Sequence, residues 1–129
     1  MAIEHLLKKK SLFIQIYDIT KATVFTGGEE DALTYAALIE NRERLFNEIK
    51  SLDEKIPETP RGTDAERALS DIRNTVRGIV ELDKKNEADV TRIINGLKKS
   101  LREIKEGKNA SNKYSEYLTN DGVYFDKKN

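Results

Sequence analysis

The sequence predicts an all-α protein, an elongated antiparallel helical bundle or coiled coil of three long helices with a short helical or irregular C-terminal tail. Charged residues make up 36% of the 129 residues, against roughly 25% in an average soluble protein. The chain contains only two Pro and no Trp, and its apolar residues recur at intervals of three and four. This composition and spacing are typical of long solvated helices and argue against a β fold rich in turns.

The first predicted helix spans residues 3–25. Its main apolar stripe, at helical spacing, consists of Leu6, Phe13, Ile16, Tyr17, Thr20 and Val24. Ile14, Ile19 and Phe25 lie off that stripe, so the apolar arc is wide. We therefore expect this helix to be buried on more than one side. A strand is the alternative, but the run is too long for one strand.

The second predicted helix spans residues 29–55, between Gly27-Gly28 and Pro57. Acidic residues fill its first turn, where the positive end of the helix dipole favours them, and Thr26 with Glu29 matches a capping box. Its seam, at steps of three and four, consists of Tyr35, Leu38, Arg42, Leu45, Ile49, Leu52 and Ile56. This is a heptad seam with one Arg in it.

The third predicted helix spans residues 64–106. Thr63 and Glu66 match a capping box at its start, and Gly107 is expected to end it. Its seam consists of Ala65, Leu69, Ile72, Val76, Ile79, Asp83, Asn86, Val90, Ile93, Leu97, Leu101 and Ile104. At 1.5 Å per residue this helix is about 65 Å long. It outruns its partners unless the first two helices stack end to end along it.

The bundle is therefore predicted to occupy residues 1–107, and residues 108–129 form a tail of different composition. Four of the nine aromatic residues lie in this tail: Tyr114, Tyr117, Tyr124 and Phe125. Three roles stay open for them. They can fold back and cap the bundle, anchor a partner, or act as a lid that a partner displaces.

Residues that carry catalysis are nearly absent. Without Cys and with His5 as the one His, the chain has no disulfide scaffold, no thiol nucleophile and no ordinary zinc site. No phosphate-binding glycine loop or nucleophile elbow occurs. His5 lies beside the chain end and is interpreted as a solvated terminal residue. We expect no enzymatic activity, no cofactor and no metal.

Charge and hydropathy bear on partners and compartment. The 23 basic residues cancel the 23 acidic ones, which disfavours binding to nucleic acid or to an anionic membrane. The longest apolar stretch, residues 12–17, is far shorter than the roughly 20 residues of a membrane-spanning helix. We expect a cytoplasmic protein.

The second half of the third helix is the predicted partner-binding site. Asp83 and Asn86 interrupt its seam; if the seam is covered they set its register, and if it is uncovered they face water. In the uncovered case the residues after them form an exposed apolar stripe that marks a partner site. The predicted partner-binding residues are Val90, Ile93, Leu97, Leu101, Ile104, Asp83 and Asn86.

Three stretches resemble a known family. Residues 37–49 (ALIENRERLFNEI) resemble the second helix of flagellar export chaperones of the FliT and FlgN type. Residues 82–87 (LDKKNE), with the Val90 and Ile93 that follow, resemble the polar midpoint of their long third helix. Tyr114 and residues 124–128 (YFDKK) resemble the ending of many Gram-positive versions. The resemblance spans nearly the whole chain.

The resemblance implies a small cytoplasmic helical protein without enzymatic activity. Such chaperones bind the C-terminal helical region of a late axial subunit, either the filament cap or a hook–filament junction protein. They prevent premature polymerisation and deliver the subunit to the export gate and its ATPase. In some members the C-terminal segment is inhibitory, a role that would fall here to residues 114–125. The alternative interpretation is a self-assembling structural coiled coil or a helical adaptor, and a homodimer is compatible with both.

Overall fold

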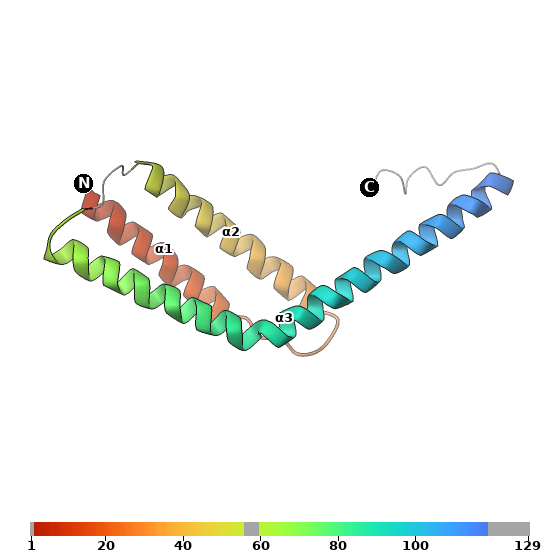
Figure 1. Ribbon diagram of the computed structural model, residues 1–129, viewed down its shortest axis with the longest axis horizontal. Helices are drawn as coiled ribbons and strands as arrows, with labels where there is room; N and C mark the ends of the chain where they lie inside the picture. Colours follow the sequence, from red (N-terminus) through yellow and green to blue (C-terminus); the bar gives the residue numbers. More distant parts are fainter. Residues whose placement is uncertain (1, 56–59, 119–129) are drawn as a thin grey trace. The chain divides into compact units, whose positions relative to one another are not determined.

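The computed structural model describes residues 2–55 and 60–118, with side chains described for residues 3–55 and 60–107. It contains the helices α1 (Ala2–Ala22), α2 (Asp31–Lys55) and α3 (Thr63–Leu118), and the residues described include no strand (Figure 1). The predicted all-α class is confirmed. Within the part of the chain described here, no helix combines the length and apolar character that a membrane span requires.

The chain divides into two compact units, Met1–Val90 and Thr91–Asn129. We call the first the bundle unit; it holds α1, α2 and residues 63–90 of α3. We call the second the C-terminal unit; its described part is the helix from Thr91 to Leu118. In the bundle unit α1 and α2 run side by side as a hairpin, not end to end (Figure 1).

Contacts between α1 and α2 show that these helices are antiparallel. Lys9 Nζ lies 2.8 Å from Asp53 Oδ1. One turn further along α1, Phe13 meets Phe46 edge to face, with ring centroids 6.3 Å apart. From the first contact to the second, the residue number increases on α1 and decreases on α2, so the two helices run in opposite directions.

Contacts between α1 and α3 show that these helices are parallel. Lys10 Nζ lies 2.8 Å from Asp71 Oδ2. Seven residues further on both helices, the Tyr17 ring lies against Gly78, so close that an added Cβ would sit 2.9 Å from Tyr17 Cε2. The bundle unit is therefore an up–down–up arrangement.

The core of the bundle unit consists of two groups of buried side chains. The first joins all three helices through Leu12, Ile16, Leu45, Ile49, Leu52 and Ile79. The second joins α1 to the first turns of α3 through Leu6, Ala65, Ala68 and Ile72. These residues belong to the predicted seams, apart from Leu12 and Ala68, and they account for the burial of α1 on two sides.

The helix ends differ from the predictions in three places. α1 ends at Ala22 and not at residue 25, α2 begins at Asp31 and not at residue 29, and α3 continues past Gly107 to Leu118. Gly107 lies inside the helix, whereas positive φ angles occur at Gly27 and Gly62, each just before a helix. The predicted helix end at Gly107 is therefore wrong, and the residues directly after it are helical.

The start of α2 is fixed by Asp31 rather than by the predicted Thr26–Glu29 capping box. The buried Asp31 carboxylate accepts hydrogen bonds from the backbone N–H groups of Thr26 at 2.9 Å and Gly27 at 2.8 Å. The Thr26 hydroxyl donates to Glu30 Oε1 at 2.8 Å. Bonds from its own backbone amide and from Thr26 hold the pKa of the Glu30 carboxyl below its ordinary value.

Candidate partner-binding surface

Asp83, one of the predicted binding residues, is already engaged inside the bundle unit. Arg42 of α2 donates from Nη1 to Asp83 Oδ1 at 2.8 Å and from Nη2 to Asp83 Oδ2 at 3.1 Å. The Arg42 side chain is largely buried, and its Cζ lies 5.9 Å from the centre of the Phe46 ring. The two polar interruptions predicted in separate seams therefore pair with each other. This covered arrangement sets the register of α2 against α3.

The boundary between the units divides the predicted binding residues. Asp83, Asn86 and Val90 belong to the bundle unit, where Asn86 and Val90 are half-buried. The remaining four belong to the C-terminal unit. Of these, Ile93 is only 4% exposed, so it offers little surface to a partner.

An exposed row of aliphatic side chains runs along α3 in the C-terminal unit. Its exposed fractions are 36% for Ile94, 43% for Leu97, 65% for Leu101 and 61% for Ile104. The spacing of three, four and three residues places all four on one side of the helix. We call these four residues the apolar stripe. Every residue from Ile94 to Gly107 is exposed.

Ile94 is the one member of the apolar stripe that is not among the predicted binding residues. Its neighbour Ile93 lies on the predicted seam because it continues the spacing from Val90. Ile94 lies three residues before Leu97, so the same spacing rule also admits it. Which of two adjacent Ile residues is exposed depends on packing, which the sequence does not show.

The aromatic tail residues fall outside the side chains that the structure describes. Tyr114 and Tyr117 belong to α3, but only their helical backbone is described. Tyr124 and Phe125 lie outside the described residues. Their assignment as a lid or an anchor therefore stays a prediction.

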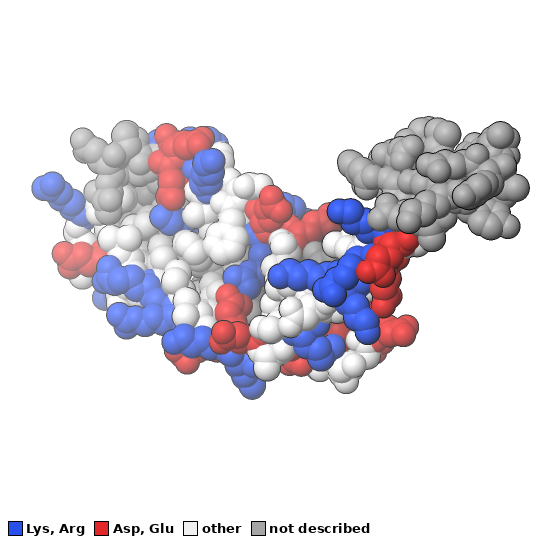
Figure 2. All heavy atoms as spheres, turned by 45° about the vertical axis from the view of Figure 1, so that its right-hand side comes forward, with Lys and Arg blue, Asp and Glu red and all other residues white. Residues whose placement is uncertain are grey.

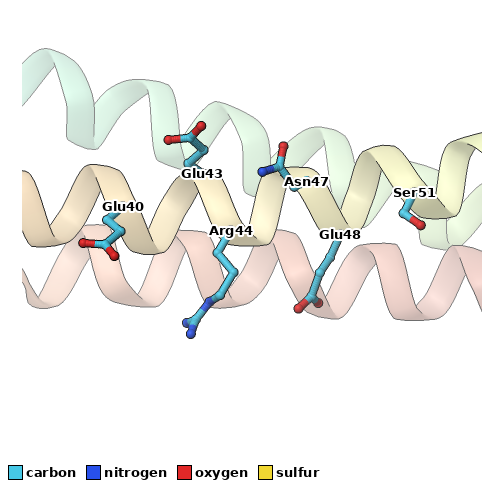
Figure 3. Close-up of a pocket in the computed structure, with 6 residues that line it drawn as sticks. All are labelled: Glu40, Glu43, Arg44, Asn47, Glu48 and Ser51. Atoms are coloured by element: carbon cyan, nitrogen blue, oxygen red, sulfur yellow. The ribbon is translucent and has the colours of Figure 1, made fainter.

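The described surface of the bundle unit includes two hollows, and neither has the enclosure of a ligand site. One lies along α2 (Figure 3) and is lined by Glu40, Glu43, Arg44, Asn47, Glu48 and Ser51. All six side chains come from one helix and are exposed, so no opposing wall closes it. The other lies between α1 and α3 beside the Lys10–Asp71 ion pair, with Leu7 partly exposed in it.

Among the residues with described side chains, no group of three or more His, Asp or Glu is arranged to hold a metal ion. His5 is partly buried, and its Nδ1 is buried without a hydrogen-bond partner, so the expectation of a solvated His is wrong. On the face shown in Figure 2, acidic and basic side chains are interspersed. The apolar stripe is therefore the candidate site.

Comparisons of the chain with models of protein families, with curated proteins and with solved structures find no match.

Proposed function

We propose that this protein is a cytoplasmic flagellar export chaperone of the FliT and FlgN type. It binds the C-terminal helical region of a late axial subunit, the filament cap or a hook–filament junction protein. Binding keeps the subunit from polymerising prematurely and delivers it to the export ATPase and gate.

The observation that carries this proposal is the apolar stripe on α3. Four aliphatic side chains at helical spacing, exposed along one side of a helix, form the surface that a second amphipathic helix covers. Burying a fully exposed Leu or Ile contributes about 1.5–3 kcal/mol. The stripe can therefore supply several kcal/mol from residues that the fold of the bundle unit leaves unused.

The mechanism is competition for one surface. A subunit that polymerises through a helical terminus exposes an apolar face on that helix until it assembles. When the apolar stripe covers this face, the helix is no longer free to pair with another subunit. Release then requires only separation of the two helices, because no covalent step is involved.

The family resemblance supports the same function. Residues 37–49 form the middle of α2, which contributes Arg42 and Leu45 to the bundle unit. Residues 82–87 lie on α3 where Asp83 receives Arg42. The third stretch, at the C-terminus, lies mostly outside the described residues.

The test is a capture experiment with the full-length chain as bait in the cytoplasm of a flagellated bacterium that encodes it. We expect a late axial subunit to be enriched and identified by mass spectrometry. Purified subunit should then bind in a calorimetric titration, and Leu101→Glu should abolish this binding. Lys99→Glu, on the opposite side of the helix, is the matched control. If the purified axial subunits do not bind the wild-type chain, the proposal is wrong.

A variant of the tail tests in the same assay whether its aromatic residues act as a lid or as anchors. Tyr124→Ser with Phe125→Ser should raise affinity for the subunit if these residues act as a lid. The same change should lower affinity if they are anchors. Either result separates two alternatives that the sequence leaves open.

A further inference from the structure

The apolar stripe is bordered on one edge by basic side chains. Lys98, Arg102 and Lys105 each follow a stripe residue by one position, which turns them by about 100° around the helix axis. All three are exposed. We call them the basic row; it runs parallel to the stripe over two turns of α3.

The opposite edge of the stripe is different. Gly96, Ser100 and Glu103 each precede a stripe residue by one position, so this edge has small side chains and one carboxylate. Apart from the adjacent residues and the backbone of its own helix, no heavy atom of the described residues lies within 4 Å of where a Cβ at Gly96 would be. The binding surface is therefore asymmetric: one edge is positively charged, and the other has two small residues and one carboxylate.

We propose that the partner of the apolar stripe is an amphipathic α-helix that carries a row of Asp or Glu beside its apolar face, and that this acidic row lies against Lys98, Arg102 and Lys105. The inference rests on the proposed function and deepens it, because it names the chemistry of the client helix. Opposite charges that flank a shared apolar seam select both the partner and its orientation.

The charge pattern disfavours a second copy of this chain as the occupant. In an antiparallel pair of identical helices, positions on the same edge face each other, so one basic row would meet the other. In a parallel pair the basic row would meet the edge with Gly96, Ser100 and Glu103, where one carboxylate would face three basic side chains. A like-charge contact is repulsive and opposes both affinity and register.

A membrane surface is also a poorer fit than a helix. Helices that lie on anionic lipid bury a broad apolar face, often with Trp or Phe. The apolar stripe is narrow and aliphatic, and Glu103 and Glu106 are exposed on the same two turns. A narrow stripe of this kind is the geometry of a helix–helix seam.

The expected preference for an acidic partner helix can be estimated from the strength of exposed ion pairs. Each contributes about 0.2–1 kcal/mol, so three pairs should change affinity by about tenfold. Because the charges are exposed, the preference should shrink when salt shortens the Debye length from about 10 Å at 0.1 M to about 3 Å at 1 M. Apolar burial supplies the rest of the affinity and is not weakened by salt.

The experiment is a calorimetric titration of the full-length chain with two synthetic helical peptides of about 20 residues, a length at which isolated helices form. Both peptides carry the same Leu seam, one with Glu and the other with Lys along its edges. The Glu peptide should bind about tenfold more tightly at low salt. Lys98→Glu, Arg102→Glu and Lys105→Glu together should reverse the preference, since Glu also supports the helix.

A matched control changes the net charge equally away from the stripe. It combines Lys84→Glu, Lys85→Glu and Lys99→Glu, all at exposed positions, and should keep the preference for the Glu peptide. Equal binding of both peptides, or loss of the preference in this control, overturns the inference. So does binding to phosphatidylglycerol vesicles or dimerisation of the chain in light scattering, if either occurs without binding of the Glu peptide.

The outcomes separate this inference from the proposed function. If an axial subunit binds the wild-type chain and its charge-reversed variant equally, the acidic partner is wrong and the chaperone stands. If the Glu peptide is preferred but no axial subunit binds, the surface chemistry is right and the flagellar assignment is wrong.

Discussion

Arg42 and Asp83 lie 41 residues apart in the sequence and join α2 to α3 through two parallel hydrogen bonds of 2.8 and 3.1 Å. Arg42 interrupts the apolar seam of α2, and Asp83 is one of the two polar residues, with Asn86, that interrupt the seam of α3. Because Arg presents two N–H groups in a fixed fork, this pairing is satisfied in one relative position of the helices. The ion pair therefore selects the register of α2 against α3 as well as adding stability.

The first prediction is that the two residues are energetically coupled. Arg42→Met leaves the Asp83 carboxylate without its partner. Asp83→Leu leaves the largely buried Arg42 guanidinium without its acceptor. We expect each single change to lower the free energy of unfolding by about 1–2 kcal/mol, since Asp83 is partly exposed to water. Urea unfolding followed by circular dichroism measures both values.

The double variant completes the cycle. With both partners apolar, the loss should be smaller than the sum of the single losses by about 0.5–1 kcal/mol. Strictly additive losses would show that the two side chains do not stabilise each other. Lys84→Met, at an exposed site beside Asp83 in the sequence, is the control and should change stability little.

Periodicity predicts which side chains of a helix are buried, and here it does so well. Leu45, Ile49, Leu52 and Ile79 lie on the predicted seams and in the core. Which residues of two helices meet is harder to predict, because it depends on the relative direction and register of the helices. The sequence shows Arg42 and Asp83 as two separate exceptions, and only the antiparallel packing of α2 against α3 brings them together.

The sequence predicts the ends of helices less accurately than their buried faces, for reasons visible at single residues. A Gly ends a helix when it adopts a left-handed conformation, but inside a helix it costs only about 1 kcal/mol relative to Ala. Gly107 lies inside α3, so the helix continues through it. At the start of α2 any of three consecutive acidic residues could accept hydrogen bonds from the backbone of the preceding turn. Asp31 does so, because its short carboxylate reaches the N–H groups of Thr26 and Gly27.

The second prediction concerns that turn. Asp31→Ala removes the acceptor of the Thr26 and Gly27 N–H groups at a site only 1% exposed. A hydrogen bond to a charged group contributes about 1.5–3 kcal/mol, so we expect a loss of about 2 kcal/mol in urea unfolding. Glu29→Ala is the control, since Glu29 is exposed, and should change stability by less than about 0.5 kcal/mol. Equal effects of the two changes would contradict the role given to Asp31.

The third prediction compares two glycines of the same helix. At Gly78 a Cβ would lie 2.9 Å from Tyr17 Cε2, whereas at Gly96 it would meet nothing within 4 Å. Gly78→Ala gains helix propensity of about 1 kcal/mol but forces the Tyr17 ring out of its place, at a cost of about 1–3 kcal/mol. We expect it to lower the melting temperature. Gly96→Ala should strengthen the helical signal at 222 nm without lowering the melting temperature.

The last prediction separates residues that hold the fold from residues kept for a partner. Ile16 is fully buried between the helices, whereas Leu101 is 65% exposed. Ile16→Ala should therefore lower the free energy of unfolding by about 2–4 kcal/mol, and Leu101→Glu should change it by less than about 0.5 kcal/mol. Binding should respond to Leu101→Glu instead, because a carboxylate in a helix–helix seam loses its water without gaining a partner. If Leu101→Glu unfolds the protein as Ile16→Ala does, the apolar stripe belongs to the core and is not a surface for a client.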